Sequence, residues 1–255
     1  MSEVIPEIAL RGVGKRFRSG APVLENITLT IEKGDFVTVL GPSGCGKSTL
    51  LRLIAGLTPL SAGEIAVNGM TPVNARELMS FIFQDATLLP WRTVERNVGL
   101  GLELEWATRA ARAQKVGEML ALVGLSSVAT LYPRQLSGGM KMRVSIARAL
   151  ATRPRILLMD EPFAALDEMT RDRMNEELLR LQREHRWTVV FVTHSVAEAV
   201  FLSSRIVILA PHPGRIHEVV QVELEGHRTD DTRASGKFED EISRISRILR
   251  GVHSA

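Results

Sequence analysis

Short segments of alternating apolar and polar residues recur near the start of the chain. This period of two is found in Glu7 to Phe17 (EIALRGVGKRF), Asn26 to Glu32 (NITLTIE) and Gly63 to Gly69 (GEIAVNG). It is typical of strands that are buried on one face only, and such strands are usually antiparallel. Asn68-Gly69 is also a tight-turn signal. The pattern therefore predicts a small antiparallel β region.

Continuously apolar runs and helical spacing dominate the rest of the chain. The runs are short and rich in branched residues, as expected for parallel strands covered on both faces: Asp35 to Leu40, Ile156 to Met159, Thr188 to Val192 and Arg205 to Leu209. Apolar residues with helical spacing occupy other segments: Thr49 to Leu57, Ala107 to Val123 (Val116, Met119, Leu120, Val123) and Glu168 to Arg186 (Met174, Leu178, Leu181). The alternation of the two patterns predicts an α/β fold with a parallel-sheet core.

The order of these segments also predicts the domain organisation. From roughly Arg76 to Tyr132 helical spacing replaces strand patterns, which indicates a helical insertion rather than part of a sheet. We expect one α/β domain over residues 7–225, with a helical subdomain at roughly 85–155, and a tail over residues 226–255. The tail carries an amphipathic helix that we expect to pack on its own domain through one face: Phe238, Ile242, Ile245 and Leu249.

Composition and charge narrow the compartment and the partners. The 255 residues include 45% hydrophobic and 24% charged residues, which is ordinary for a globular protein. A formal charge of +3 is too mild to indicate nucleic acid, though it suits an anionic membrane surface. No apolar run approaches the roughly 20 residues that span a bilayer, and MSEVIPEIAL lacks a signal-sequence pattern. We therefore expect a cytosolic protein, in agreement with its single cysteine, Cys45.

The stretch GPSGCGKST, Gly41 to Thr49, fits the phosphate-loop pattern G-x-x-x-x-G-K-[ST]. It lies between an apolar run and a helix-prone run, and its glycines let backbone N–H groups wrap a phosphate chain. Lys47 is expected to reach the β and γ phosphates, and the Ser48 hydroxyl to ligate Mg²⁺. A glycine-rich turn with a solvated lysine is the alternative, but it leaves the strand, loop and helix order unexplained.

Further segments supply the groups that phosphate chemistry needs. Asp160 and Glu161 end the run ILLMDE, where Asp160 is suited to the Mg²⁺ shell and Glu161 to polarising an attacking water. In LSGGM, Ser137 is suited to cap a helix, and Gly138 and Gly139 to admit a phosphate. Gln84 and His194 are weaker signals that follow strand-like runs, FIF and TVVFVT. Two adjacent acids or a capped helix would each be ordinary structural features if found alone.

Together, GPSGCGKST, Gln84, LSGGM, LLMDE, Ala165-Leu166-Asp167 and His194 resemble the motif set of an ATP-binding cassette ATPase of the P-loop type, over roughly Glu7 to Pro211. The resemblance implies ATP and Mg²⁺ as cofactors. The implied nucleotide-binding residues are Phe17, Gly41, Pro42, Ser43, Gly44, Cys45, Gly46, Lys47, Ser48, Thr49, Ser137, Gly138, Gly139 and Asp167. The implied metal ligands are Ser48, Gln84 and Asp160. The implied catalytic residues are Lys47, Gln84, Glu161 and His194.

The run FQDATLLPWRTVERNV, Phe83 to Val98, together with LSGGMKMRVSIARAL and MDEPFAALDEMTR, is similar to the importer subfamily for nitrate, sulfonate, taurine and related small solutes. The cassette family implies a head-to-tail homodimer. The importer resemblance implies integral membrane permease subunits, an extracytoplasmic solute-binding protein and a position on the cytoplasmic face of the membrane. It also implies that the groove near Trp91 receives a helix of the permease. Two residues depart from the commoner family pattern: Met140 stands in place of glutamine, and Phe17 in place of tyrosine.

Two other classes of protein remain to be weighed. A soluble ATPase of the same superfamily that acts on nucleic acid or ribosomes usually has a long coiled coil or two cassettes, and this sequence shows neither. A P-loop kinase or GTPase has no use for LSGGM. For Cys45 two interpretations stay open, a small space-filling side chain or a thiol whose pKa is lowered by Lys47 and the helix N-terminus.

Overall fold

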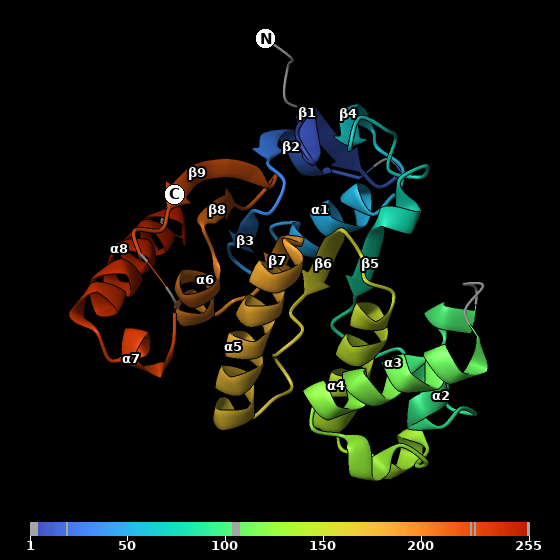
Figure 1. Cartoon of the computed structure of the whole chain (residues 1–255). Helices are drawn as coiled ribbons and strands as arrows, with labels where there is room; N and C mark the ends of the chain where they lie inside the picture. The colour runs from blue at the N-terminus through green and yellow to red at the C-terminus, as the bar shows by residue number, and fades with distance from the viewer. Residues whose placement is uncertain (1–4, 19, 104–107, 225, 227, 254–255) are drawn as a thin grey trace.

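The computed structural model describes residues 5–18, 20–103, 108–224, 226 and 228–253. Its strands form two sheets (Figure 1). The smaller sheet has the order β2-β1-β4, built from β1 (Ile8–Arg16), β2 (Pro22–Ile31) and β4 (Ala62–Val67). The larger sheet has the order β5-β6-β7-β3-β8-β9, built from β3 (Phe36–Leu40), β5 (Met79–Ile82), β6 (Ile156–Asp160), β7 (Thr188–Val192), β8 (Arg205–Ala210) and β9 (Arg215–Gln221).

Eight α-helices lie among the described residues: α1 (Lys47–Ile54), α2 (Val94–Val98), α3 (Arg109–Leu122), α4 (Gly138–Ala151), α5 (Glu168–His185), α6 (Val196–Leu202), α7 (Asp230–Arg233) and α8 (Gly236–His253). Short 3₁₀ helices connect some of them: Arg76–Leu78, Gly101–Glu103, Ser126–Val128 and Pro133–Gln135. The chain thus alternates between strands and helices, as the sequence predicts.

The small sheet confirms the predicted antiparallel region. β1 pairs antiparallel with both β2 and β4. The alternation of β1 places Ile8, Leu10 and Val13 in the core, together with apolar side chains of α1. At the predicted turn, Val67 and Met70 exchange two backbone hydrogen bonds of 2.8 and 2.9 Å. The residues between them have positive φ angles, which is the backbone that an Asn-Gly pair favours.

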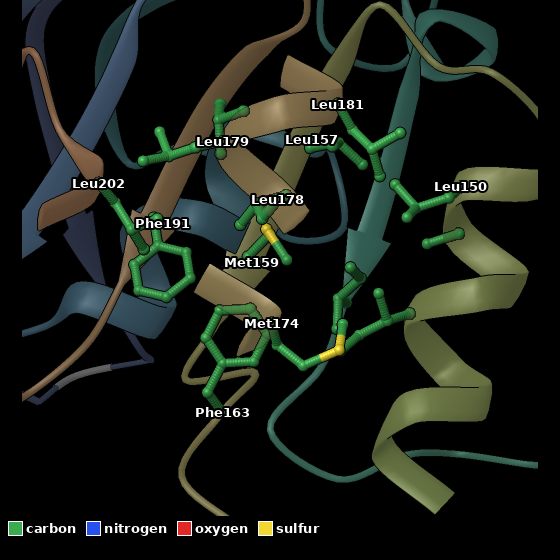
Figure 2. Packing of buried hydrophobic residues seen from close by; sticks show 14 of the residues in the cluster. Leu150, Leu157, Met159, Phe163, Met174, Leu178, Leu179, Leu181, Phe191 and Leu202 are labelled. Atoms are coloured by element: carbon green, nitrogen blue, oxygen red, sulfur yellow. The ribbon is translucent and has the colours of Figure 1, made fainter. Parts of the chain in front are cut away.

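The main sheet is parallel from β5 to β8, and β9 is antiparallel to β8. Every residue of β3, β6 and β7 is buried, because one face packs on α1 and the small sheet, and the other on α4, α5 and α6. Figure 2 shows this second layer, where Leu178 and Met174 of α5 lie near Met159 of β6 and Phe163. Covering on both faces explains why these runs are continuously apolar.

The stretch from Arg76 to Tyr132 departs from the prediction at its beginning. Met79–Ile82 form β5, which pairs with β6 as an edge strand of the main sheet, so the expectation that this stretch is no part of a sheet was wrong at these residues, whereas the strand character of FIF, Phe81 to Phe83, agrees with β5. β5 has only four residues and three of them are half-buried, and a segment so short carries no clear period. The helices that follow agree with the pattern, since Val116, Met119 and Leu120 of α3 are buried. Ala107, where we expected this helix to begin, lies outside the described residues.

The C-terminal tail packs on the main domain, as expected. Phe238 and Ile245 of α8 are buried in the same core as α6 and β8. Ahead of α8, the guanidinium of Arg228 donates hydrogen bonds to the carbonyls at the end of α6, including that of Ser203 at 2.7 Å. Burial lowers the pKa of Arg228 to about 10, so the side chain stays charged at neutral pH. A cation at this place satisfies carbonyl groups that α6 leaves without a helical partner.

Candidate functional site

The phosphate loop joins the end of β3 to the start of α1. At Gly41 a side chain would place its Cβ 2.6 Å from the carbonyl oxygen of Leu209 and 2.8 Å from Cys45 Sγ. At Gly46 the Cβ would lie 2.6 Å from Leu24, and φ is +100°. Both positions therefore require glycine, because close packing holds the loop against β8 and β2.

Lys47 and Ser48 are held at the start of α1 by polar contacts. The ammonium of Lys47 donates to the carbonyl oxygens of Gly41 (2.8 Å) and Pro42 (2.9 Å), so it folds back over the loop. The Ser48 hydroxyl donates to Asp160 Oδ1 at 2.8 Å. Burial raises the pKa of Asp160, while the hydrogen bond from Ser48 opposes that shift. A hydroxyl and a carboxylate oxygen side by side are the hard ligands that Mg²⁺ prefers, so these residues fit the ion.

Glu161 and His194 meet where β6 and β7 end. The Glu161 N–H donates to the carbonyl of Val192 at 2.9 Å, and Glu161 takes a left-handed φ of +48° that turns the chain away from the strand. Its Oε2 lies 3.3 Å from His194 Nδ1. The histidine side chain is 68% exposed, so the pair faces outward beside the buried Asp160. The structure thus brings together two residues that lie 33 positions apart in the chain.

A buried network behind His194 was not foreseen from the sequence. Thr193 donates from its hydroxyl to the carboxylate of Glu198, and Arg171 Nε lies 3.7 Å from the other oxygen of that carboxylate. Arg171 also donates to the carbonyl of Leu166 at 2.9 Å. Burial raises the pKa of Glu198. Glu198 lies in the first turn of α6 and Thr193 just before its N-cap Ser195, so the network forms where this helix begins.

The residues of LSGGM lie at the start of α4. Ser137 caps this helix by accepting a hydrogen bond from the N–H of Met140 at 3.2 Å, as predicted. A Cβ at Gly138 would meet no atom within 4 Å, so the helix end is open to an incoming group. In the view of Figure 1, α4 begins on the side of the molecule away from α1. Asp167 caps α5 by accepting from the N–H of Thr170 at 2.9 Å, and this hydrogen bond lowers the pKa of Asp167.

The loop after β5 carries the exposed Gln84. It is anchored by Arg148 of α4, which donates to the carbonyls of Ala86 (3.1 Å) and Thr87 (3.0 Å). This contact links the Gln84 loop to the helix that Ser137 starts, and the sequence offered no sign of it. Farther along the same loop, Trp91 is 71% exposed.

Phe17 lies just beyond β1 and is 51% exposed. The Lys15 ammonium is 4.7 Å from the centre of its ring, a cation–π distance. An exposed aromatic ring is free to stack on a planar ligand.

The hypothesis of an activated thiol at Cys45 was wrong. The side chain is 1% exposed, and burial raises its pKa above the ordinary value despite the opposing charge of Lys47. We therefore expect iodoacetamide to alkylate the folded protein at neutral pH at least tenfold more slowly than the urea-unfolded chain, because alkylation needs an accessible thiolate. Mass spectrometry of Cys45 over time measures both rates. Equal rates in the two states would contradict the burial of this thiol.

The fold and the site define a P-loop nucleotide-binding protein. The family model described as ABC transporter matches residues 24–164. The chain is 47% identical over 227 residues to an uncharacterized ABC transporter ATP-binding protein of Methanocaldococcus jannaschii, covering 89% of this chain and 84% of that protein. It is 46% identical to the aliphatic sulfonates import ATP-binding protein of Bacillus cereus, covering 85% and 86%. The chain therefore belongs to the ABC transporter family and is one of its ATPases.

Among solved structures, the fold resembles the dimeric post-hydrolysis state of the ATP-binding cassette MJ0796 bound to ADP and Pi. The TM-score is 0.79 at 33% sequence identity, covering 86% of this chain and 100% of that one. The predicted fold class is confirmed: a P-loop α/β cassette with an antiparallel region, a mainly parallel sheet and helices between β5 and β6.

Proposed function

We propose that this chain is the ATP-hydrolysing subunit of an importer for a small anionic solute of the sulfonate, nitrate or taurine kind. The observation that carries the proposal is that two pairs of side chains lie together near the ends of β6 and β7. Ser48 is paired with Asp160, and Glu161 with His194. One pair suits a metal bound to a triphosphate and the other suits an attacking water. The sulfonate importer relative supports the solute class.

In this proposal Lys47 leaves its loop carbonyls to bind the β and γ phosphates, and the N–H groups of Gly41 to Thr49 wrap them. Ser48 and Asp160, with Gln84, would hold Mg²⁺, which when bound neutralises charge on the phosphates. Glu161 accepts the proton of the attacking water, and His194 orients that water toward the γ-phosphorus. Phe17 stacks on the adenine.

The site is incomplete in one chain. Ser137, Gly138 and Gly139 start a helix whose free N–H groups suit a phosphate, and we propose that they cover the γ-phosphate held by a second copy. Asp167 would then lie near the boundary between the copies. The dimeric cassette MJ0796 supports such a homodimer. Among the described helices, none combines the length and the apolar composition of a membrane span. For an importer subunit we propose a peripheral position on the cytoplasmic face of the membrane, and the sulfonate importer relative supports this.

Permease subunits and an extracytoplasmic solute-binding protein complete the proposed system. We retain residues 7–225 as the proposed cassette and 226–255 as its tail; the boundary at residue 225 lies outside the described residues.

Purification from a membrane extract tests the proposed assembly with permease subunits. An integral membrane protein should be recovered with the chain, and the solute should stimulate ATPase activity of the complex in proteoliposomes. Recovery with RNA or ribosomes instead would favour the soluble ATPase alternative.

Trp91 is the residue we propose at the permease contact. Its large ring is exposed on the Gln84 loop, and the proposed nucleotide site gives it no role. Trp91→Ala should lower solute-stimulated ATPase activity of the complex about tenfold and leave hydrolysis by the isolated subunit within twofold of wild type. Tyr132→Ala, which removes another exposed ring, serves as the control. Equal losses in both assays would place Trp91 in the catalytic site instead.

A further inference from the structure

A cavity lies at the end of the main sheet opposite the nucleotide site. Its volume is about 420 Å³, and its floor is formed by buried residues that include Pro154, Trp187 and Thr188. The nucleotide site lies where β6 and β7 end, whereas this cavity lies where the same two strands begin. The cavity and the nucleotide site therefore lie at opposite ends of these strands.

The rim of this cavity is strongly cationic. Lys33, Arg153, Arg155 and Arg186 are exposed side chains on it, against the single carboxylate of Glu7 in the floor. Arg155 pairs with Glu7 at 3.4 Å. Within the described ranges, the other three cations form no ion pair. Since the whole chain has a formal charge of only +3, this rim concentrates unbalanced positive charge in one place.

Two of the arginines occupy backbone positions that favour glycine. Arg153 follows α4 with φ +48°, and Arg186 caps the end of α5 with φ +53°. Glycine adopts this left-handed backbone without strain, whereas arginine does not. The carbonyl end of a helix attracts cations, but the last turn of α5 already contains Arg183 and His185. This attraction therefore does not explain Arg186. Backbone preference therefore does not account for an arginine at either position.

We propose that this cavity binds the phosphate group of a small anion, either free phosphate or a phosphorylated small molecule. Two guanidinium groups and an ammonium around one concave floor match the charge and the planar hydrogen-bonding geometry that phosphate oxygens take. The volume admits a molecule larger than phosphate itself. This inference is independent of the proposed transport function, because it uses none of the residues of the nucleotide site.

Isothermal titration calorimetry tests the proposal on the full chain in 0.15 M KCl, with MgAMP-PNP saturating the nucleotide site so that phosphate cannot enter it. The probes are inorganic phosphate and glycerol 3-phosphate, and we expect at least one to bind saturably. Binding of phosphate alone would indicate the free ion, and tighter binding of the ester a phosphorylated small molecule. Absence of saturable heat with both probes would overturn the proposal.

Arg153→Gly combined with Arg186→Gly provides the decisive variant, because it removes two rim cations and also relieves two strained backbones, so the protein should fold with a Tm close to that of wild type. The dissociation constant should rise at least tenfold. The control is Arg109→Ala with Lys237→Ala, which removes the same charge from exposed positions elsewhere and should leave binding within twofold. Equal weakening in both variants would show nonspecific attraction and overturn the assignment to this cavity.

Discussion

Replacement of Glu161 with glutamine should reduce ATP turnover by about 100-fold or more, while ATP binding is retained, because the amide keeps the shape of the side chain but cannot accept the proton of the attacking water. The geometry supports this expectation, since Glu161 lies at the end of β6 beside Asp160 and 3.3 Å from His194. With chemistry blocked and binding intact, the ATP-bound dimer should accumulate. Steady-state phosphate release and size-exclusion chromatography with MgATP measure the two effects.

Glu218→Gln on β9 removes an exposed carboxylate far along the chain from this site and should hydrolyse ATP at the wild-type rate. Glu161→Gln with more than a tenth of wild-type turnover would show that a different group activates the water. Circular dichroism accompanies the assay to show that the variant is folded. A folded variant that binds no ATP would contradict the expectation that binding is retained.

The buried strands of the main sheet were predictable because burial on both faces leaves a run of apolar residues in the sequence. β3, β6 and β7 follow that rule at every position. β5 and β9 do not, since they lie at the two edges of the sheet and carry many half-buried or exposed residues. β5 pairs with β6, which is distant in the sequence, and β9 pairs with β8, which directly precedes it. Because each edge strand has a sheet neighbour on one side only, its residues lack the continuous apolar pattern of a buried strand.

The residues of the candidate site also form two groups: those that the local sequence predicts and those that only the fold brings together. Gly41 to Thr49 could be assigned from local spacing, because the loop that holds the phosphates is formed by consecutive residues. The contacts of Arg171 with Glu198 and of Arg148 with Thr87 depend on packing between separate elements, so they appear only in the fold. The sign of the Cys45 pKa shift was missed for a related reason, since the neighbouring Lys47 is visible in the sequence and burial is not.

The buried network of Thr193, Glu198 and Arg171 connects the segment before Asp167 to the segment that carries His194. Thr193 also accepts a hydrogen bond from the N–H of Ser195 at 3.0 Å, so the residues on both sides of His194 are fixed while its ring remains exposed. Glu198 does not touch the reacting groups and would act as a positioning residue. Its removal should therefore change how often the histidine is correctly placed rather than how tightly ATP binds.

Glu198→Ala should lower kcat about tenfold, equivalent to about 1.4 kcal/mol, with little change in KM. Glu198→Gln keeps an acceptor for Thr193 and should retain more activity.

Because burial raises the pKa of Glu198, the folded protein binds the proton of this carboxyl group more tightly than the unfolded chain does. The stability of wild type relative to Glu198→Gln should thus fall as pH rises from the ordinary glutamate pKa to the raised one, and stay constant above it. Urea unfolding of both proteins across that pH range measures the trend. A Glu198→Ala protein with reduced stability but wild-type kcat would restrict the network to a structural role.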